Sequence, residues 1–486
     1  MGHANVAYID DSLLQSNTFE DCENNIIDTI TLFDQLGFTV HPKKSVLVPT
    51  QQISFLGFVL NSVHMIVHLT EDKATDIAKL CLRVRNRQTL TIREWAQLVG
   101  KLVACEPGVQ YGPLHVKALE RLKDTELKAH HGNYDSVMTL TTDVLWELDW
   151  WIDNISSSFN PVTREDPTFI ITTDSSDYGW GAVVTDSDLY TSGLWSYGEQ
   201  RNHINFLELK AAWLSLKSFC ADMTDGHVRF FMDNMVAISY ISNMGGKCEG
   251  LNNLARKIWF WCVERNIWIS ASHIPGVDNV EADRLSRKMN SDLEWQLRPS
   301  LFQCIASKYG DNLSIDMFAS RINIQIPVYV SYLPDPQALA VDAFSMKWSN
   351  EHGIIYLFPP FSVIDRVLQK LVEDQATAVM VAPIWTTQPW FPGLLSRITG
   401  NCYLLPHVNN SLVHPAFPDR QHPLQKMRLG VFLLSGNNSL VEEFHHRLPV
   451  WSSIPGKTQR RNSMGVISKN GCSFAYRDKM IHLNQL

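Results

Sequence analysis

The sequence lacks any C-x-x-C pair, although it contains nine cysteines. These cysteines are scattered and odd in number, which argues against a zinc ribbon or a disulfide framework and indicates a reducing intracellular compartment, cytoplasm or nucleus. No apolar run approaches the roughly 18–20 residues that a membrane span needs. The N-terminus also lacks a basic segment followed by an apolar stretch, so we expect neither a membrane protein nor a secreted one.

An excess of positive charge is also missing. The net charge is −8, whereas nucleic-acid-binding domains are more often basic. Locally the balance differs, because eleven Lys and Arg stand against six Asp and Glu between Lys73 and Lys128, and six against one from Lys457 to the end. Two interpretations stay open for both stretches: a basic face for phosphate contacts, or a solvated helix face and a loose tail.

Apolar residues are present in sufficient number for several cores. The chain has 486 residues, of which 45% are hydrophobic and 19% are charged, as in a soluble globular protein. This length predicts about two to four domains. No period of about 20–50 residues recurs, which excludes a solenoid.

The central part of the chain places four acidic residues on four different predicted elements. The strand "TFIITTD" ends at Asp174, and the amphipathic helix "INFLELKAAWLSLKSFC" carries Glu208 just off its buried stripe. The strand "HVRFFMD" ends at Asp233, and the last helix has Asp283 in its first turns. One such acid alone would be an ordinary strand-end cap or surface residue. Four acids at one sheet edge would repel one another unless a cation neutralised them.

The oxygen ligands of these residues suit Mg²⁺ or Mn²⁺. Two such ions about 3.5–4 Å apart can stabilise both the attacking water and the leaving oxygen of a phosphodiester. The predicted metal ligands are Asp174, Glu208, Asp233 and Asp283.

Residues 166–289 resemble a type-1 ribonuclease H domain of the retroelement kind, in element order and in this D…E…D…D quartet. The segment "HIPGVDNVEADRLSR" is similar to the P-G-x-x-N-x-x-A-D-x-L-S-R ending of retrotransposon enzymes. The resemblance implies that the quartet is catalytic and that RNA–DNA hybrids are the partner. It also implies that His273 transfers a proton or assists product release; a loop histidine hydrogen-bonded near Pro275 and Gly276 is the alternative.

Three polar residues flank these acids: Ser175, Asn205 and Asn234. We expect them to contact substrate 2′-hydroxyl groups, which distinguish RNA from DNA. The domain departs from many cellular enzymes of this family, because "ISNMGGKCEGLNNLARKIW" offers only Lys247 where those enzymes insert a basic helix and loop. Grip on the hybrid would then come from a neighbouring domain, with residues 73–128 as the candidate.

Tyr8-Ile9-Asp10-Asp11 resembles the Y-x-D-D turn of a reverse transcriptase palm. "LGFTVHPKKS" is similar to the segment after the palm hairpin, with Lys43 or Lys44 near the incoming triphosphate, and "ISFLGFVLN" is similar to the primer-grip hairpin. This implies a partial palm at 1–70, a thumb and connection at 71–130, and a tether with one helix at 131–165. We expect no templated synthesis, because the third palm carboxylate and the fingers do not fit into Met1–Ala7. The missing N-terminal part of the polyprotein is therefore a candidate partner.

A connector at 290–312 precedes a third block, an α/β domain at 313–436, and 437–486 is predicted to be a disordered tail. The third block resembles the methyltransferase-like segment of DIRS-like, tyrosine-recombinase retrotransposons. Phe358-Pro359-Pro360-Phe361 is similar to the D/N-P-P-Y/F loop that holds the amino group of a target base. Phe358 cannot accept that hydrogen bond, and "DMFAS" lacks the glycines that let a cofactor approach. We therefore expect a degenerate domain.

The expected fold class is an α/β multidomain protein that contains a partial palm, thumb and connection, a ribonuclease H-like mixed sheet with flanking helices, and a C-terminal α/β domain. The expected function is metal-dependent hydrolysis of the RNA strand of RNA–DNA hybrids. The alternative is a domesticated or decayed relic that binds nucleic acid without turnover.

Overall fold

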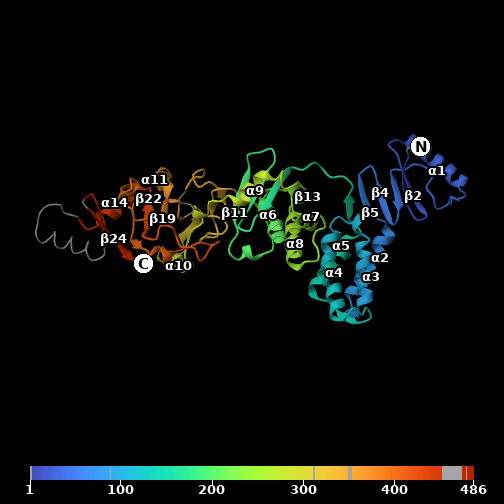
Figure 1. Ribbon diagram of the computed structural model, residues 1–486, viewed down its shortest axis with the longest axis horizontal. Coiled ribbons are helices and arrows are strands. Elements are labelled where there is room, and N and C mark those ends of the chain that lie inside the picture. Colours follow the sequence, from blue (N-terminus) through green and yellow to red (C-terminus); the bar gives the residue numbers. More distant parts are fainter. Residues whose placement is uncertain (1–2, 88, 310–311, 349–352, 451–472, 478) are drawn as a thin grey trace, which may run out of the picture. The chain divides into compact units, whose positions relative to one another are not determined.

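The computed structural model describes residues 3–87, 89–309, 312–348, 353–450, 473–477 and 479–486. The chain divides into two compact units, Met1–Asp166 with Asn243–Asn252, and Pro167–Ser242 with Asn253–Leu486. Figure 1 colours the elements along the sequence. Both units combine helices and sheets, so the predicted α/β multidomain class is confirmed. Within the described part of the chain, no helix is both long and apolar enough to cross a membrane.

The first unit begins with a hairpin of β1 (Ala4–Tyr8) and β2 (Asp11–Gln15), which pair antiparallel with Tyr8 opposite Asp11. Ile9 in the turn has φ of 52°, a left-handed conformation that is uncommon for a branched residue. Helix α1 (Phe19–Gln35) follows, and the Thr18 side chain caps it by accepting a hydrogen bond from the Asp21 N–H at 3.1 Å. The Y-x-D-D stretch therefore forms a tight hairpin turn.

A four-stranded antiparallel sheet follows, in the order β3-β4-β5-β8. At the turn between its first two strands, Leu56 and Gly57 both have positive φ, which a two-residue hairpin turn of type I′ requires. The predicted primer-grip hairpin thus has Phe55–Phe58 at its turn. The strands are β3 (Gln52–Phe55), β4 (Phe58–Asn61), β5 (Ile66–Leu69) and β8 (Phe159–Pro161).

Four helices form the second core of this unit, around the buried rings of Trp95 and Trp151. Helix α3 starts with a reciprocal capping box between Thr91 and Glu94. The helices are α2 (Glu71–Arg85), α3 (Ile92–Val103), α4 (Gly112–Ala129) and α5 (Thr142–Asn154), and the short strands β6 (Thr89–Thr91) and β7 (Val137–Thr139) pair beside them.

Residues 131–165 differ from the predicted tether. Helix α5 packs against α2 and α4, and β8 is the fourth strand of the β3–β5 sheet. The physical reason is burial: Leu148 and Trp151 of α5 are fully covered, which a free connector would leave exposed to water. The stretch is part of the domain core.

The nuclease-like part of the second unit has a five-stranded sheet in the order β11-β10-β9-β12-β13. The first three strands are antiparallel and the last three are parallel, which is the ribonuclease H-like mixed sheet expected from the sequence. The strands are β9 (Phe169–Ser175), β10 (Gly179–Val184), β11 (Tyr190–Leu194), β12 (Gly226–Met232) and β13 (Ile267–His273). The helices are α6 (Ile204–Phe219), α7 (Met235–Ser242), α8 (Glu249–Val263) and α9 (Val280–Arg287).

The C-terminal part of this unit is built on a seven-stranded sheet in the order β15-β18-β19-β22-β20-β24-β23. The interior strand β19 is buried along almost its whole length, as in a sheet covered on both faces. Its strands are β15 (Leu313–Asp316), β18 (Ile354–Leu357), β19 (Thr377–Pro383), β20 (Cys402–Leu404), β22 (Leu429–Ser435), β23 (Ser473–Tyr476) and β24 (Lys479–Gln485).

The described residues of this domain also form five helices and two short strand pairs. The helices are α10 (Pro299–Tyr309), α11 (Ile364–Glu373), α12 (Trp390–Ser396), α13 (Val408–Ser411) and α14 (Asn438–Arg447). Strand β14 (Gln296–Leu297) pairs with β21 (Leu412–Val413), and β16 (Val330–Ser331) pairs with β17 (Ala340–Val341).

The predicted boundaries at 290–312 and 437–486 need correction. Residues 290–312 contain β14 and α10 and belong to the C-terminal domain core, where Leu297 and Ile305 are buried. Strands β23 and β24 add to the main sheet beyond residue 436, because Ile481 and Leu483 bury their side chains against it. Helix α14 also lies within the predicted tail, whereas residues 451–472 and 478 lie outside the described residues.

A polar seam joins the nuclease-like sheet to the C-terminal domain. The Glu199 carboxylate accepts hydrogen bonds from Arg321 at 2.7 and 3.1 Å and forms an ion pair with Lys210 at 2.6 Å. The same Arg321 guanidinium donates to the backbone carbonyl of Leu194 on β11 at 3.1 Å. Nearby, Gln200 donates to the backbone carbonyl of Ala416 at 3.0 Å. The two parts of this unit therefore share an interface.

Candidate metal centre

The strands of the nuclease-like sheet deliver two carboxylates to its edge. Asp174 lies at the end of β9, opposite Gly181 of β10, and Asp233 follows the last residue of the parallel strand β12. Helix α6 packs against β9 and β10 and brings Glu208 to the same place. The sequence pattern predicted Glu208 just off the buried stripe of the helix. In the structure Glu208 is only 3% exposed, so it lies within the buried face.

Three of the four predicted acids converge. One carboxylate oxygen each from Asp174, Glu208 and Asp233 lies within 4.8 Å of the other two. The Ser175 N–H donates to Glu208 Oε1 at 3.2 Å, whereas Glu208 Oε2 is buried without a hydrogen-bond partner. Buried polar atoms are nearly always satisfied, and among the described residues this oxygen has no partner, so it is available to a cation. The residues present therefore fit a divalent cation with oxygen ligands.

The pKa values of the buried acids are shifted by their surroundings. Burial, together with the neighbouring charges of Asp174 and Asp233, raises the pKa of Glu208 to about 9. Burial also raises the pKa of Asp174 to about 6, against a hydrogen bond from Ser286 that lowers it. Three carboxylates this close cannot all be ionised at neutral pH without a counter-charge. A bound cation would supply that charge.

The fourth predicted acid, Asp283, lies on α9 at the margin of this group. Its carboxylate accepts a hydrogen bond from Arg287 Nε at 2.5 Å, and its side chain is 42% exposed. Its charge is near enough to raise the pKa of Asp174. The structure thus places Asp283 beside the acids, outside the close group of three.

The predicted substrate residues lie next to the acids. Asn205 in the first turn of α6 and Asn234 after β12 are joined by a hydrogen bond from Asn234 Nδ2 to Asn205 Oδ1 at 3.0 Å. His273 ends β13 opposite Met232 and is exposed. The Gly276 backbone passes beside Asp233, since a Cβ at Gly276 would be 3.5 Å from Asp233 Oδ2. The loop that follows His273 therefore borders the acid group.

Two residues of this site were missed by the sequence analysis, although both lie in the quoted segment "HIPGVDNVEADRLSR". Asn279 is 1% exposed, and its Nδ2 donates to the backbone carbonyl of Thr173 at 3.1 Å, one residue before Asp174. Ser286 is fully buried, and its hydroxyl donates to Asp174 Oδ2 at 2.6 Å. The signal that could have identified them was their position within the motif.

The predicted polymerase residues are not part of this group. Tyr8 is 56% exposed, and Asp10, Asp11, Lys43 and Lys44 are also exposed. In the described part of the chain, the acidic residues close enough to share an ion are Asp174, Glu208 and Asp233. The hairpin turn therefore presents its two carboxylates to solvent in this chain.

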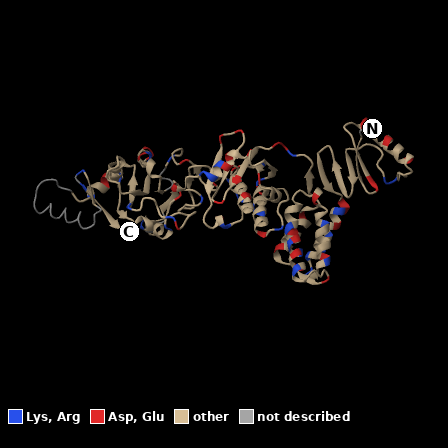
Figure 2. Cartoon of the chain, in the orientation of Figure 1, with Lys and Arg blue, Asp and Glu red and all other residues tan. Residues whose placement is uncertain are grey.

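The basic stretch 73–128 is largely balanced by acids within its own unit. Arg85 pairs with Asp149, Arg93 with Asp135 at 2.8 Å, and Lys117 with Glu120 at 3.1 Å. Figure 2 shows both acidic and basic residues on the helices of this unit. For the basic residues that form these pairs, the arrangement favours the interpretation of this stretch as solvated helix faces. Lys457 and its basic neighbours of the predicted tail, except Arg477 and Lys479, lie outside the described residues.

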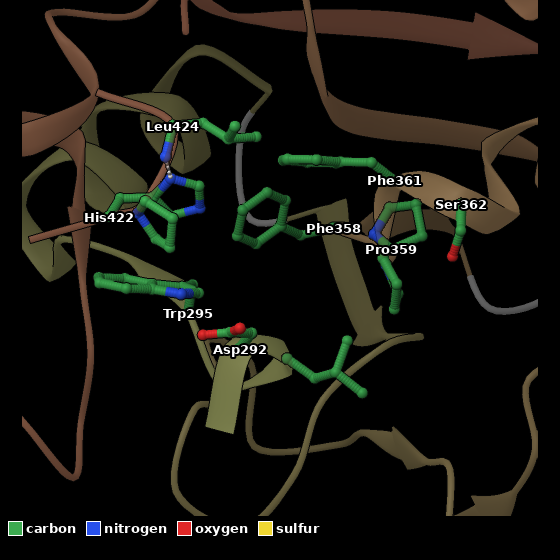
Figure 3. A pocket seen from close by; sticks show the side chains of 11 residues that line it. Asp292, Trp295, Phe358, Pro359, Phe361, Ser362, His422 and Leu424 are labelled. Carbon is green, nitrogen blue, oxygen red and sulfur yellow. Dashed lines mark hydrogen bonds between the residues drawn. The ribbon is translucent and has the colours of Figure 1, made fainter. Parts of the chain in front are cut away.

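A cavity with a volume of about 310 Å³ lies in the C-terminal domain. Its wall includes Phe358 and Phe361 on one side and Trp295 and His422 on the other (Figure 3). The Leu424 N–H donates to His422 Nδ1 at 3.1 Å, and the indole N–H of Trp295 is buried without a partner. The wall combines aromatic rings with proline and leucine side chains, and the Phe358 side chain offers no hydrogen-bond acceptor there.

Sequence comparison relates the chain to viral polyproteins. It is 24% identical over 302 residues to a polyprotein of Cassava vein mosaic virus that is described as enzymatic, and this match covers 60% of the chain and 44% of the polyprotein. It is 25% identical over 303 residues to the enzymatic polyprotein of Cauliflower mosaic virus strain D/H, covering 58% and 41%. The chain is similar to retroelement polyproteins. It spans less than half the length of these curated relatives.

A shorter match is closer, with 32% identity over 132 residues to the enzymatic polyprotein of Cauliflower mosaic virus strain NY8153, covering 25% of the chain and 19% of the polyprotein. No protein-family model matches the chain. The chain is thus similar in sequence to viral enzymatic polyproteins, and this similarity supports the predicted retroelement relationship.

Among solved structures, the chain resembles a foamy viral protease-reverse transcriptase in complex with an RNA/DNA hybrid, with a TM-score of 0.29 and 14% identity, covering 60% of this chain and 40% of that one. It also resembles LC11-RNase H1 in complex with an RNA/DNA hybrid, with a TM-score of 0.21 and 23% identity, covering 24% and 93%. Both TM-scores are low. The description of the five-stranded sheet as ribonuclease H-like therefore rests on its strand order.

Proposed function

We propose that the chain is a metal-dependent endonuclease that hydrolyses the RNA strand of RNA–DNA hybrids. The observation that supports this function is the convergence of Asp174, Glu208 and Asp233, with one buried oxygen of Glu208 unpaired. Two divalent ions, Mg²⁺ or Mn²⁺, would supply stabilisation of the attacking and leaving oxygens at this site. Asp283 is the fourth proposed ligand residue.

Other residues of the chain would position the metal ligands, contact the substrate and transfer protons. Ser175 fixes Glu208 through its backbone N–H. The hydrogen-bonded pair Asn205 and Asn234 is proposed to face the 2′-hydroxyl groups of the RNA strand. His273, exposed at the end of β13, is proposed to carry a proton to or from the leaving group.

We further propose that the chain derives from a DIRS-like retrotransposon polyprotein. Its N-terminal hairpin with Tyr8, Asp10 and Asp11 would be part of a polymerase palm, Lys43 would lie near a triphosphate, and the rest of the polyprotein would be its partner. The hairpin geometry and the similarity to viral enzymatic polyproteins support this origin.

A cleavage assay tests the proposed activity. The full chain with Mg²⁺ is expected to cut the labelled RNA strand of a hybrid and to leave RNA duplex and DNA duplex intact. Asp233→Asn is expected to lower the rate by at least about 100-fold, since it removes one charged ligand. Asp222→Asn is the control, because Asp222 is exposed at the turn before β12 and is expected to leave the rate unchanged.

Absence of RNA cleavage by the wild-type chain, or equal rates for wild type and Asp233→Asn, would contradict the proposal. In the first case the alternative of a non-catalytic nucleic-acid-binding relic would be favoured, and tight hybrid binding without turnover would support it.

A further inference from the structure

Ser286 occupies a constrained position between α9 and the acid group. It is fully buried, and its hydroxyl lies 2.6 Å from Asp174 Oδ2 and 2.9 Å from the backbone carbonyl of Asp283. A serine hydroxyl has one proton to donate. The carboxylate is the closer and charged acceptor, and hydrogen bonds to ionised acceptors are stronger. The Ser286 hydroxyl therefore donates its hydrogen bond to Asp174.

The position of Ser286 is itself fixed by the sheet. Its backbone carbonyl accepts a hydrogen bond from Ser176 Oγ at 2.7 Å, so the end of α9 is tied to the chain that follows β9. Gly181 of β10 allows this approach, because a Cβ there would lie 2.8 Å from the Ser286 nitrogen and 2.5 Å from Leu285 Cβ. Ser286 is thus held on the helix side while its hydroxyl reaches Asp174.

We propose that Ser286 is a positioning residue for the metal centre: its hydroxyl holds one oxygen of Asp174 and leaves the other oxygen free for the cation. This inference rests on the proposed function, because it assumes that Asp174 is a metal ligand. Fixing one oxygen restricts rotation of the carboxylate, and such outer contacts orient ligands in metal sites. The same bond connects Asp174 to the helix that carries Asp283.

Metal binding without nucleic acid tests the role directly. Mn²⁺ affinity is measured by electron paramagnetic resonance of free Mn²⁺ at one fixed pH, for the full chain and for Ser286→Ala, Ser286→Cys and Ser215→Ala. Ser286→Ala is expected to weaken binding by about tenfold or more. Ser286→Cys, which keeps a weak donor, is expected to fall between wild type and Ser286→Ala.

Ser215→Ala is the matched control. Ser215 is also a fully buried helical serine, but its hydroxyl donates to the Ala212 carbonyl at 2.9 Å on α6. Its Mn²⁺ affinity is expected to equal that of wild type. Thermal melts of the metal-free variants separate an effect on the ligand from a loss of fold, since Ala is a good helix former at either position.

The outcomes are distinct. If wild type binds Mn²⁺ and cleaves hybrid but Ser286→Ala binds Mn²⁺ equally well, the positioning role is wrong and the proposed function stands. If wild type neither binds Mn²⁺ nor cleaves, the proposed function fails, and this inference fails with it. If Ser286→Ala does not fold, equal Mn²⁺ affinities for Ser286→Cys and wild type would overturn the role, and a weaker affinity for Ser286→Cys would support it.

Discussion

Glu208 carries the main electrostatic cost of the acid group. Its pKa of about 9 reflects burial first and then the charges of Asp174 and Asp233, so without a cation it is protonated at neutral pH. A carboxyl whose pKa is raised on folding stabilises the protein below its unfolded pKa, and this contribution is lost as the pH rises through the folded value. Metal-free protein should therefore lose stability between about pH 4.5 and pH 9 through this residue.

Replacement of this acid separates stability from function. Near pH 8.5 without metal, we expect the unfolding free energy of Glu208→Gln to exceed that of wild type by at least about 1 kcal/mol, because an amide avoids the ionisation cost. Its melting temperature should therefore be higher. The variant should lose Mn²⁺ binding and hybrid cleavage. Thermal melts near pH 5.5 and pH 8.5, with and without Mn²⁺, measure both effects.

Glu264→Gln serves as the control, because Glu264 is 73% exposed and should leave the pH dependence unchanged. A Glu208→Gln variant with the same loss of stability at high pH as wild type would contradict this explanation.

At the scale of elements, the packing of α9 against β10 sets the place of Asp283. A Cβ at Gly181 would lie 2.6 Å from the Ala282 carbonyl and 2.5 Å from Leu285 Cβ, distances that neither backbone nor Cβ can relieve by rotation. The absence of a side chain at this one strand position thus allows the helix to approach.

Gly181→Ala is expected to push α9 away from the strand. The unfolding free energy should fall by about 1–3 kcal/mol, as for other overpacked cores, and hybrid cleavage should fall as Asp283 and Ser286 move. Gly198→Ala provides the control, because nothing lies within 4 Å of a Cβ there and the change should stay within about 0.5 kcal/mol. Chemical denaturation and cleavage rates measure both, and wild-type values for Gly181→Ala would refute the packing role.

The nuclease elements could be predicted from sequence because their signals are local. Each of the two strands that lead to an acid has seven residues, several of them apolar, and is followed by a turn, and the quoted motif predicted Asp283 on a helix. The contacts of Asn279 and Ser286 could not be predicted, since they join residues 106 and 112 positions apart. Strand β24 was missed for a related reason: its parallel partner β20 is far away in sequence, and the intervening segment reads as a tail.

At the scale of the whole molecule, the second unit depends on the seam around Glu199. Burial raises the pKa of Glu199, but the Arg321 charge with hydrogen bonds from Arg321, Lys210 and Ser196 overcomes this and lowers it to about 2. The side chains of Glu199 and Arg321 are 14% and 21% exposed. Removal of one partner from such a buried pair leaves the other charge uncompensated.

Arg321→Met is therefore expected to destabilise this unit by about 2 kcal/mol or more, even with Lys210 still present. In combination with Glu199→Gln, the loss should be smaller than the sum of the two single losses. Arg447→Met, which removes an exposed pair with Glu443, should cost less than about 1 kcal/mol. Additive losses in the double variant, measured by denaturation, would show that the seam pair does not couple the two domains.

The seam also limits where this chain can be divided into shorter folded pieces. Strand β11 is the outer strand of the nuclease-like sheet, and the guanidinium of Arg321 from the neighbouring domain occupies its Leu194 carbonyl. A nuclease separated after residue 289 would leave that strand edge open and Glu199 without its arginine, two features that promote aggregation and unfolding. The ribonuclease H-like sheet is therefore expected to be stable only when the C-terminal domain remains attached to it.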